Sequence, residues 1–248
     1  MFSRKNIAEV TAELLGAGFF TYALLAALTK GSLPAAWAAG LAVAVGIFWF
    51  GRISGAHFNP AVTIGFWTAG KIKTLKGIAF IAAQVLGAFA AVQLFQWVTG
   101  SPLHASSPDF KSAGLVSEML GMFIWAFAVA AVVYRKYLAG LAAAAVGLAV
   151  VLGVLVGGAN AVGFLNPATA LTVLGVGSGV WGIYVVGPVV GAIVAVNLYA
   201  LLFDDERASF RTAVKAAEAS VTARTKKAAP AKKTAAKKPA AKKRATRK

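Results

Sequence analysis

The chain has 248 residues, of which 59% are hydrophobic, and its mean hydropathy is +0.74. This composition excludes an ordinary soluble domain and indicates an integral membrane protein. The absence of cysteine excludes disulfides, thiolate metal sites and thiol catalysis, and two histidines are too few for a histidine-rich metal site. No constellation of nucleophile, base or metal ligands is evident, so we expect neither an enzyme nor a bound cofactor.

Positive charge is unevenly distributed and divides the chain into two regions. Residues 1–203 hold ten Lys/Arg and four acidic residues, whereas residues 204–248 hold fifteen Lys/Arg and four acidic residues. We therefore predict a transmembrane domain over 1–203 and a basic cytoplasmic tail over 204–248. The tail is a low-complexity Lys/Ala/Pro sequence without an apolar span, and its self-repulsion predicts that it is largely disordered.

Six apolar runs predict six transmembrane helices. They cover about residues 7–28, 34–51, 77–98, 115–134, 138–156 and 180–203. The first run follows a short basic segment, as in a signal peptide, but it is too long for one and contains Glu9 and Glu13. We interpret it as an uncleaved span. Eight Lys/Arg fall on one side of this arrangement and two on the other, which predicts cytoplasmic termini.

Two Asn-Pro-Ala motifs interrupt the series of spans. Asparagine is a favoured helix N-cap, and proline at the first helical position gives up no hydrogen bond, so each motif predicts a loop that leads into a helix. The apolar runs 60–69 and 167–176 form roughly 15 Å of helix, about half of a ~30 Å hydrocarbon core. We therefore predict two half-membrane helices. The motif residues are Asn59, Pro60, Ala61, Asn166, Pro167 and Ala168.

The two halves of the membrane domain, about 7–99 and 115–203, repeat the same pattern. Glu-Leu-Leu-Gly begins at Glu13 and Glu-Met-Leu-Gly begins at Glu118, 46 and 48 residues before the respective asparagines. Each half contains three spans, an odd number, so the halves must have opposite orientations in the membrane. Inverted repeats with broken helices that meet at the midplane are an architecture of transport proteins.

At these residues the chain resembles the aquaporins, the major intrinsic protein family. The resemblance covers roughly 7–203 and rests on Ser-Gly-Ala-His-Phe-Asn-Pro-Ala-Val-Thr at 54–63, on the second Asn-Pro-Ala and on the two glutamates. It implies an all-α membrane fold of six transmembrane helices plus two re-entrant half-helices. It also implies a homotetramer with one pore per subunit, embedded in the lipid bilayer of the plasma membrane.

The resemblance assigns roles around the two motifs. The asparagine amides would donate hydrogen bonds to passing water, and the half-helix dipoles would exclude cations. Glu13 and Glu118 would hold the backbones of the re-entrant loops. Backbone carbonyls and vestibule surface would come from Gly55, Ala56, His57, Val162, Gly163 and Phe164. The alternative is that both asparagines are simple helix caps and that the glutamates lie near a wet interface.

The expected outer constriction departs from the family pattern. The resemblance implies, counting from the asparagines, that it consists of Ala39, Val154, Gly163 and Thr169, and Thr169 stands where many family members carry arginine. These residues are small or aliphatic and uncharged, so we expect a permissive pore for water and small neutral solutes such as glycerol, urea or ammonia. Two alternatives stay open: a secondary transporter of a small solute, and a membrane tether that binds anionic lipid or nucleic acid through its tail.

Overall fold

A computed structural model describes residues 3–204, apart from 32, 101, 104 and 105. The predicted disordered tail, except for Asp204, lies outside the described residues. Every regular element in the described part is a helix, as expected for the all-α fold. The elements are α1 (Arg4–Lys30), α2 (Ala35–Phe50), α3 (Pro60–Thr68), α4 (Thr74–Thr99), α5 (Ser112–Arg135), α6 (Ala139–Gly157), α7 (Pro167–Leu174), η1 (Val180–Val186) and α8 (Gly187–Phe203).

Five helices are long and apolar enough to span a membrane: α1, α4, α5, α6 and the continuous run of η1 and α8. The one predicted span that is shorter, α2, has 16 residues, or roughly 24 Å of helix. It is shorter than the about 20 residues of a usual span. Its sequence nevertheless has no charged residue, so its length, and not its polarity, sets it apart.

The last span differs from the expected regular helix in its first seven residues, which form the π-helix η1. The reason lies at Pro188, the second residue of α8. Proline has no N–H and its ring collides with the carbonyl four residues earlier in an α-helix. The wider π turn avoids this collision, and Gly187 N–H donates to the carbonyl of Gly182, five residues back.

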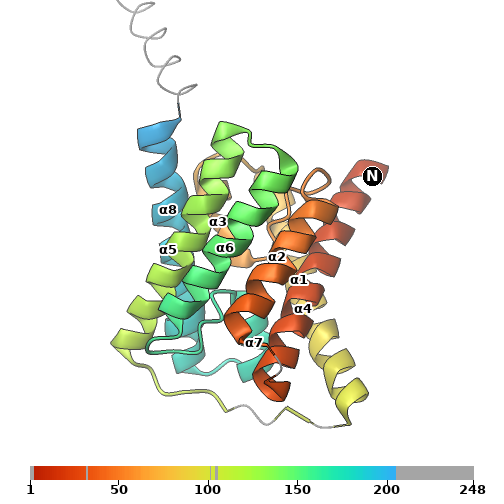
Figure 1. Ribbon diagram of the computed structural model, residues 1–248, viewed down its shortest axis with the longest axis vertical. Coiled ribbons are helices and arrows are strands. Elements are labelled where there is room, and N and C mark those ends of the chain that lie inside the picture. The colour runs from red at the N-terminus through yellow and green to blue at the C-terminus, as the bar shows by residue number, and fades with distance from the viewer. Residues whose placement is uncertain (1–2, 32, 101, 104–105, 205–248) are drawn as a thin grey trace, which may run out of the picture. The chain divides into compact units, whose positions relative to one another are not determined.

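The packing of the helices repeats between the two halves. In the first half α1 packs on α4, and in the second α5 packs on α8. Contacts between the halves follow the repeat as well. The contact of α3 with α8 corresponds to that of α7 with α4, and α2 packs on its own equivalent, α6. Figure 1 shows that α1 begins at the end of the bundle where α8 finishes, whereas α5 begins at the opposite end. We call these the termini end and the loop end.

Glycine allows the closest helix contact in each half. A side chain at Gly87 of α4 would overlap the backbone carbonyl of Leu14, and one at Gly191 of α8 would overlap the carbonyl of Met119. Leu14 and Met119 directly follow the two glutamates of the repeat. Small residues let helix backbones approach closely, which is how helices associate in lipid. The glycines therefore fix the distance from each glutamate-bearing helix to its partner.

Polarity in the bundle is the reverse of that in a soluble protein. Large apolar side chains lie on the outside; Leu75, Trp97 and Leu138, for example, are each 80% exposed. The interior holds polar groups with no exposed surface, including Glu13 and Glu118. An apolar exterior around buried polar groups suits a lipid environment and directs attention to the interior for function.

We expect Gly87→Ala to destabilise the bundle, because the new methyl group would overlap the Leu14 carbonyl. Overpacking of this kind costs about 1–3 kcal/mol. The matched control is Gly140→Ala, at a helical position where a Cβ would meet no atom within 4 Å, and it should be neutral or slightly stabilising. Thermal unfolding of the two variants in detergent measures the difference; equal unfolding temperatures would contradict the packing role of Gly87.

Candidate functional site

The two half-helices begin as their motifs predict. Asn59 and Asn166 have extended backbones, and their Oδ1 atoms accept hydrogen bonds from Ala61 N–H at 2.8 Å and Ala168 N–H at 3.0 Å. A proline occupies the first turn of each helix. The helices α3 and α7 have nine and eight residues, one and two fewer than the ranges predicted from hydrophobicity. Each asparagine is therefore the N-cap of a short helix.

The two asparagines also bind each other's loops. Asn59 Nδ2 donates to the carbonyl of Leu165 at 3.0 Å, and Asn166 Nδ2 donates to the carbonyl of Phe58 at 3.0 Å. Each amide thus caps its own helix with its oxygen and holds the opposite loop with its nitrogen. An amide nitrogen carries two hydrogens, so each retains donor capacity. Asn59 Nδ2 has one further neighbour, the weak acceptor Sδ of Met122 at 3.9 Å.

Phe58 and Leu165 present these carbonyls only because their backbones are left-handed. Their φ angles are +52° and +54°, unfavourable values for residues with a Cβ. Sequence reasoning did not identify either residue as part of the site. The usable signal is the glycines that receive their side chains: Phe58 fits against Gly16 and Gly46, and Leu165 fits against Gly121, Gly153 and Gly157. Packing of the two side chains against these glycines holds the strained backbone in place.

Glu118 binds the loop before the second motif. Its carboxylate accepts hydrogen bonds from three consecutive backbone N–H groups, those of Gly163 at 2.8 Å, Phe164 at 2.9 Å and Leu165 at 2.7 Å. The side chain has no exposed surface. Every partner is a donor, which matches the acceptor-only chemistry of a carboxylate. In a lipid-embedded bundle no bulk water is available to replace these three bonds.

Glu13 occupies the corresponding place in the first half but has a mixed set of partners. It accepts from the backbone N–H groups of His57 at 3.0 Å and Phe58 at 2.6 Å, from Ser54 Oγ at 2.6 Å and from Gln84 Nε2 at 2.7 Å. Gln84 lies three residues before Gly87; Pro188 stands at the corresponding place before Gly191. Glu13 therefore binds the side chains of Ser54 and Gln84, whereas Glu118 binds a third backbone N–H group.

The first loop borders a pocket at the termini end. The pocket has a volume of about 350 Å³, and its lining includes His57, Gly55 and Phe66 together with three lysines. The His57 ring stacks on Phe66 with a centroid distance of 5.4 Å, and its Nδ1 lies 3.1 Å from Thr63 Oγ1. Ala56, between Gly55 and His57 in the loop, is buried and has a φ of +53°.

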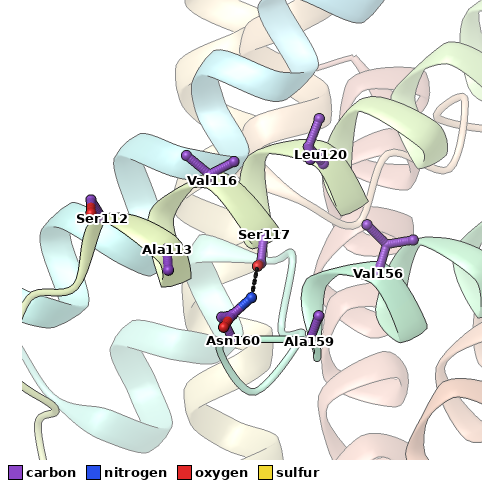
Figure 2. A pocket seen from close by; sticks show the side chains of 8 residues that line it. All are labelled: Ser112, Ala113, Val116, Ser117, Leu120, Val156, Ala159 and Asn160. Carbon is purple, nitrogen blue, oxygen red and sulfur yellow. Dashed lines mark hydrogen bonds between the residues drawn. The ribbon is translucent and has the colours of Figure 1, made fainter.

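The second loop is exposed only at its outer part. Val162 is 41% exposed and donates its N–H to the Tyr184 hydroxyl oxygen at 3.3 Å, whereas Phe164 is buried against the Tyr184 ring. Asn160 Nδ2, near the start of the loop, donates to Ser117 Oγ at 3.2 Å (Figure 2). This bond lies on a pocket of about 510 Å³ between α5 and α6 that includes no motif residue. Asn160 therefore fastens the loop to α5.

The four predicted constriction residues are all buried, but they differ in which residues they contact. Gly163 packs on the carbonyl of Val154, and Ala39 belongs to the same buried cluster as Val154. Thr169 makes a contact that the sequence did not indicate: its hydroxyl lies 2.8 Å from the hydroxyl of Thr21 on α1. Both threonines have no exposed surface.

The polar groups that meet inside the bundle are amides, hydroxyls and backbone groups. Such groups can hydrogen-bond a small neutral molecule. Among the described residues, no group of three or more His, Asp or Glu side chains lies close enough together to hold a metal ion. The carboxylates of Glu13 and Glu118 are the strongest potential ligands, but their oxygens already accept hydrogen bonds from the loops.

Comparison with known proteins gives the family. The profile of the family described as "Major intrinsic protein" matches residues 1–199. The chain belongs to the major intrinsic protein family. It is 34% identical to aquaporin NIP1-1 of Zea mays over 215 residues, which are 79% of this chain and 75% of that protein. It is 33% identical to a glycerol uptake facilitator protein of Streptococcus pneumoniae over 190 residues, which are 65% of this chain and 80% of that protein.

A solved structure shares the fold. The aquaglyceroporin from Plasmodium falciparum superimposes with a TM-score of 0.66 at 22% identity, covering 79% of this chain and 96% of that one. Members of the family are channels and not enzymes, and they are multi-pass integral membrane proteins. The family, the all-α membrane fold and the non-enzymatic class predicted from the sequence are therefore confirmed.

Replacing Glu118 by alanine should be strongly destabilising, because it leaves three buried N–H groups without an acceptor. Each unsatisfied group costs about 1–3 kcal/mol. The control is Asp109→Ala, which removes an exposed carboxylate at the loop end. Size-exclusion chromatography after heating should show loss of the folded Glu118→Ala protein tens of degrees below the control. A Glu118→Ala protein as heat-resistant as the control would contradict the role of this carboxylate as the anchor of the loop.

Proposed function

We propose that the chain is a passive channel for water and small neutral solutes such as glycerol, urea and ammonia. The observation that carries the proposal is the reciprocal bonding of Asn59 and Asn166 across the two loops. It directs the N-termini of α3 and α7 toward one another inside an apolar bundle. Helix caps alone would not require two half-helices related by an inverted repeat.

The proposed pore function follows from the charges at this meeting point. Each half-helix contributes about half a positive charge at its N-terminus, so cations are repelled from both sides. The remaining donor capacity of the two amides attracts the oxygen of a passing water or hydroxyl group. A water held in this way points its hydrogens away from both amides, which breaks a continuous proton wire. Motif residues thus exclude charge, while neutral hydrogen-bonding solutes pass.

The loops supply the acceptors that the amides lack. Irregular backbone at membrane depth is tolerated where it is buried in protein or lines a cavity. Because the carboxylates of Glu13 and Glu118 take the loop N–H groups, the carbonyls of Gly55, Ala56 and His57 are left to face the pathway at the termini end. Those of Val162, Gly163 and Phe164 do so at the loop end. These carbonyls would guide hydroxyl and amide hydrogens of the solute.

The outer constriction is assigned to Ala39, Val154, Gly163 and Thr169. In place of an arginine it offers the paired hydroxyls of Thr21 and Thr169. A hydroxyl donates and accepts, so this pair can exchange its mutual bond for bonds to a polyol or to urea. An uncharged constriction of this kind favours small neutral solutes and does not restrict the channel to water.

Two further features belong to the proposal. The channel lies in the plasma membrane, and by the positive-inside rule its termini are cytoplasmic. The termini end carries Lys71, which pairs with Asp204 at 3.7 Å, and Lys76, which pairs with Glu9 at 2.8 Å. The channel is a homotetramer, with the apolar outer faces of the helices providing the subunit contacts. A secondary transporter is not favoured, because Glu13 and Glu118 are engaged by the loops, Glu9 is paired with Lys76, and none of them is free to couple an ion gradient.

The proposal is tested by stopped-flow light scattering of proteoliposomes. The chain should conduct water, glycerol and urea faster than protein-free liposomes. Thr169→Arg should lower glycerol flux about tenfold, equivalent to about 1.4 kcal/mol of barrier height, because a guanidinium replaces the hydroxyl pair. Val176→Arg adds the same charge at a residue that is 75% exposed and is the control. A wild-type chain without flux above the lipid background for any of the three solutes would overturn the proposal.

For the tail we propose attraction to anionic lipid headgroups, with nucleic acid as the competing partner. Deleting residues 222–248 should abolish binding to anionic vesicles that the full chain binds, and the binding should weaken as salt increases. Vesicles of neutral lipid are the control. Salt-dependent binding to duplex DNA without preference for anionic vesicles would favour nucleic acid instead.

A further inference from the structure

Two buried aromatic rings meet across the interior of the bundle. Phe20 of α1 and Trp125 of α5 are each 1% exposed, and their ring centroids are 5.7 Å apart. The two helices belong to opposite halves, and in the described part of the chain their backbones make little contact with each other. The rings therefore bridge a space that the backbones leave between the halves.

The position of Trp125 along α5 places it on the proposed pathway. Met122, one turn before it, lies against Asn59 Nδ2, and Val129, one turn after it, lines the pocket at the termini end. Val133 continues the same wall of that pocket. Residues spaced by three or four positions share one face of a helix. One face of α5 thus runs from the pocket, past the indole of Trp125, to the asparagines.

Phe20 reaches the same depth from the other half. The residue four positions earlier, Gly16, touches Phe58, and the next residue, Thr21, bonds to Thr169 one turn after Asn166. Phe20 lies seven residues after Glu13, as Trp125 lies seven residues after Glu118. The two rings are therefore equivalent positions of the repeat and meet where the halves face each other, beside the half-helix N-termini.

We propose that the Phe20–Trp125 pair, and not the outer constriction, is the narrowest point of the pathway and sets the largest solute that passes. This inference rests on the proposed channel function. The constriction consists of alanine, valine, glycine and threonine, whereas this point is occupied by two of the largest side chains. Both rings are almost fully buried, and they pack against each other across the space between the halves. A solute passes when a ring rotates aside, and a larger solute requires a larger displacement.

The rings are also the groups that can yield. Asn59, Asn166 and Thr169 are equally buried, but each is fixed by a hydrogen bond of 3.0 Å or less. Phe20 and Trp125 belong to the same buried apolar cluster as the flexible side chain of Met122. Rotation of a packed ring breaks only weak dispersion contacts and no hydrogen bond of the loops. The pair therefore acts as an apolar barrier between two polar sections of the pathway.

The test is Trp125→Leu in proteoliposomes, with water, urea and glycerol fluxes measured on the same preparation. We expect glycerol flux to rise several-fold and to rise more than water flux, because the larger solute gains more from the removed ring. Phe20→Leu should act in the same direction. The control is Trp97→Leu, which shortens a tryptophan that is 80% exposed on the outer face of α4. Trp125→Phe, a smaller change, replaces Trp125→Leu if that protein does not fold and should give a smaller gain.

The outcomes separate this inference from the proposed function. A wild-type chain that conducts while Trp125→Leu and Phe20→Leu leave the glycerol-to-water ratio unchanged would overturn the inference alone. A larger gain in that ratio from Val154→Ala than from Trp125→Leu would move the narrowest point to the constriction and also overturn it. Absence of flux in all variants would overturn the channel function itself. Flux that appears only after the ring is removed would support the rings as the narrowest point and would overturn the channel function of the wild-type chain.

Discussion

The structure depends on one constraint: backbone groups that enter a membrane without helical partners must be satisfied inside the protein. Both re-entrant loops meet this constraint in the same way. A buried glutamate accepts the loop N–H groups, and the opposite asparagine donates to the last loop carbonyl. Everything else follows from it, including the glycines that bring each glutamate-bearing helix close and the gaps that receive Phe58 and Leu165.

Sequence reasoning identified what local chemistry determines. Asparagine before proline is a helix N-cap wherever it occurs, and both α3 and α7 begin at that point. The apolar runs located the long helices because hydrophobic length is a property of the segment itself. The π-helix η1 was missed because Pro188 lies inside the predicted span 180–203, where a proline indicates a disturbed helix but does not indicate that the preceding turns become a π-helix.

The site itself was only partly accessible from the sequence. Thr21 was missed because no motif marks it and its partner Thr169, which directly follows the second motif, is 148 residues away. Phe58 directly precedes the first motif, yet its role depends on a backbone angle that its residue type does not indicate. Phe20 and Trp125 become equivalent only when the halves are aligned on their glutamates. Contacts between distant segments require the fold, whereas caps and spans do not.

The reciprocal bonds between the halves also bear on how the chain is made. Residues 7–99 leave the ribosome well before Leu165 and Asn166 exist, so the amide of Asn59 and the carbonyl of Phe58 begin without partners. Neither half can complete its own loop, because each supplies the group that the other lacks. The first loop must therefore stay hydrated until the second arrives. We therefore expect each loop to be completed only when the two halves assemble.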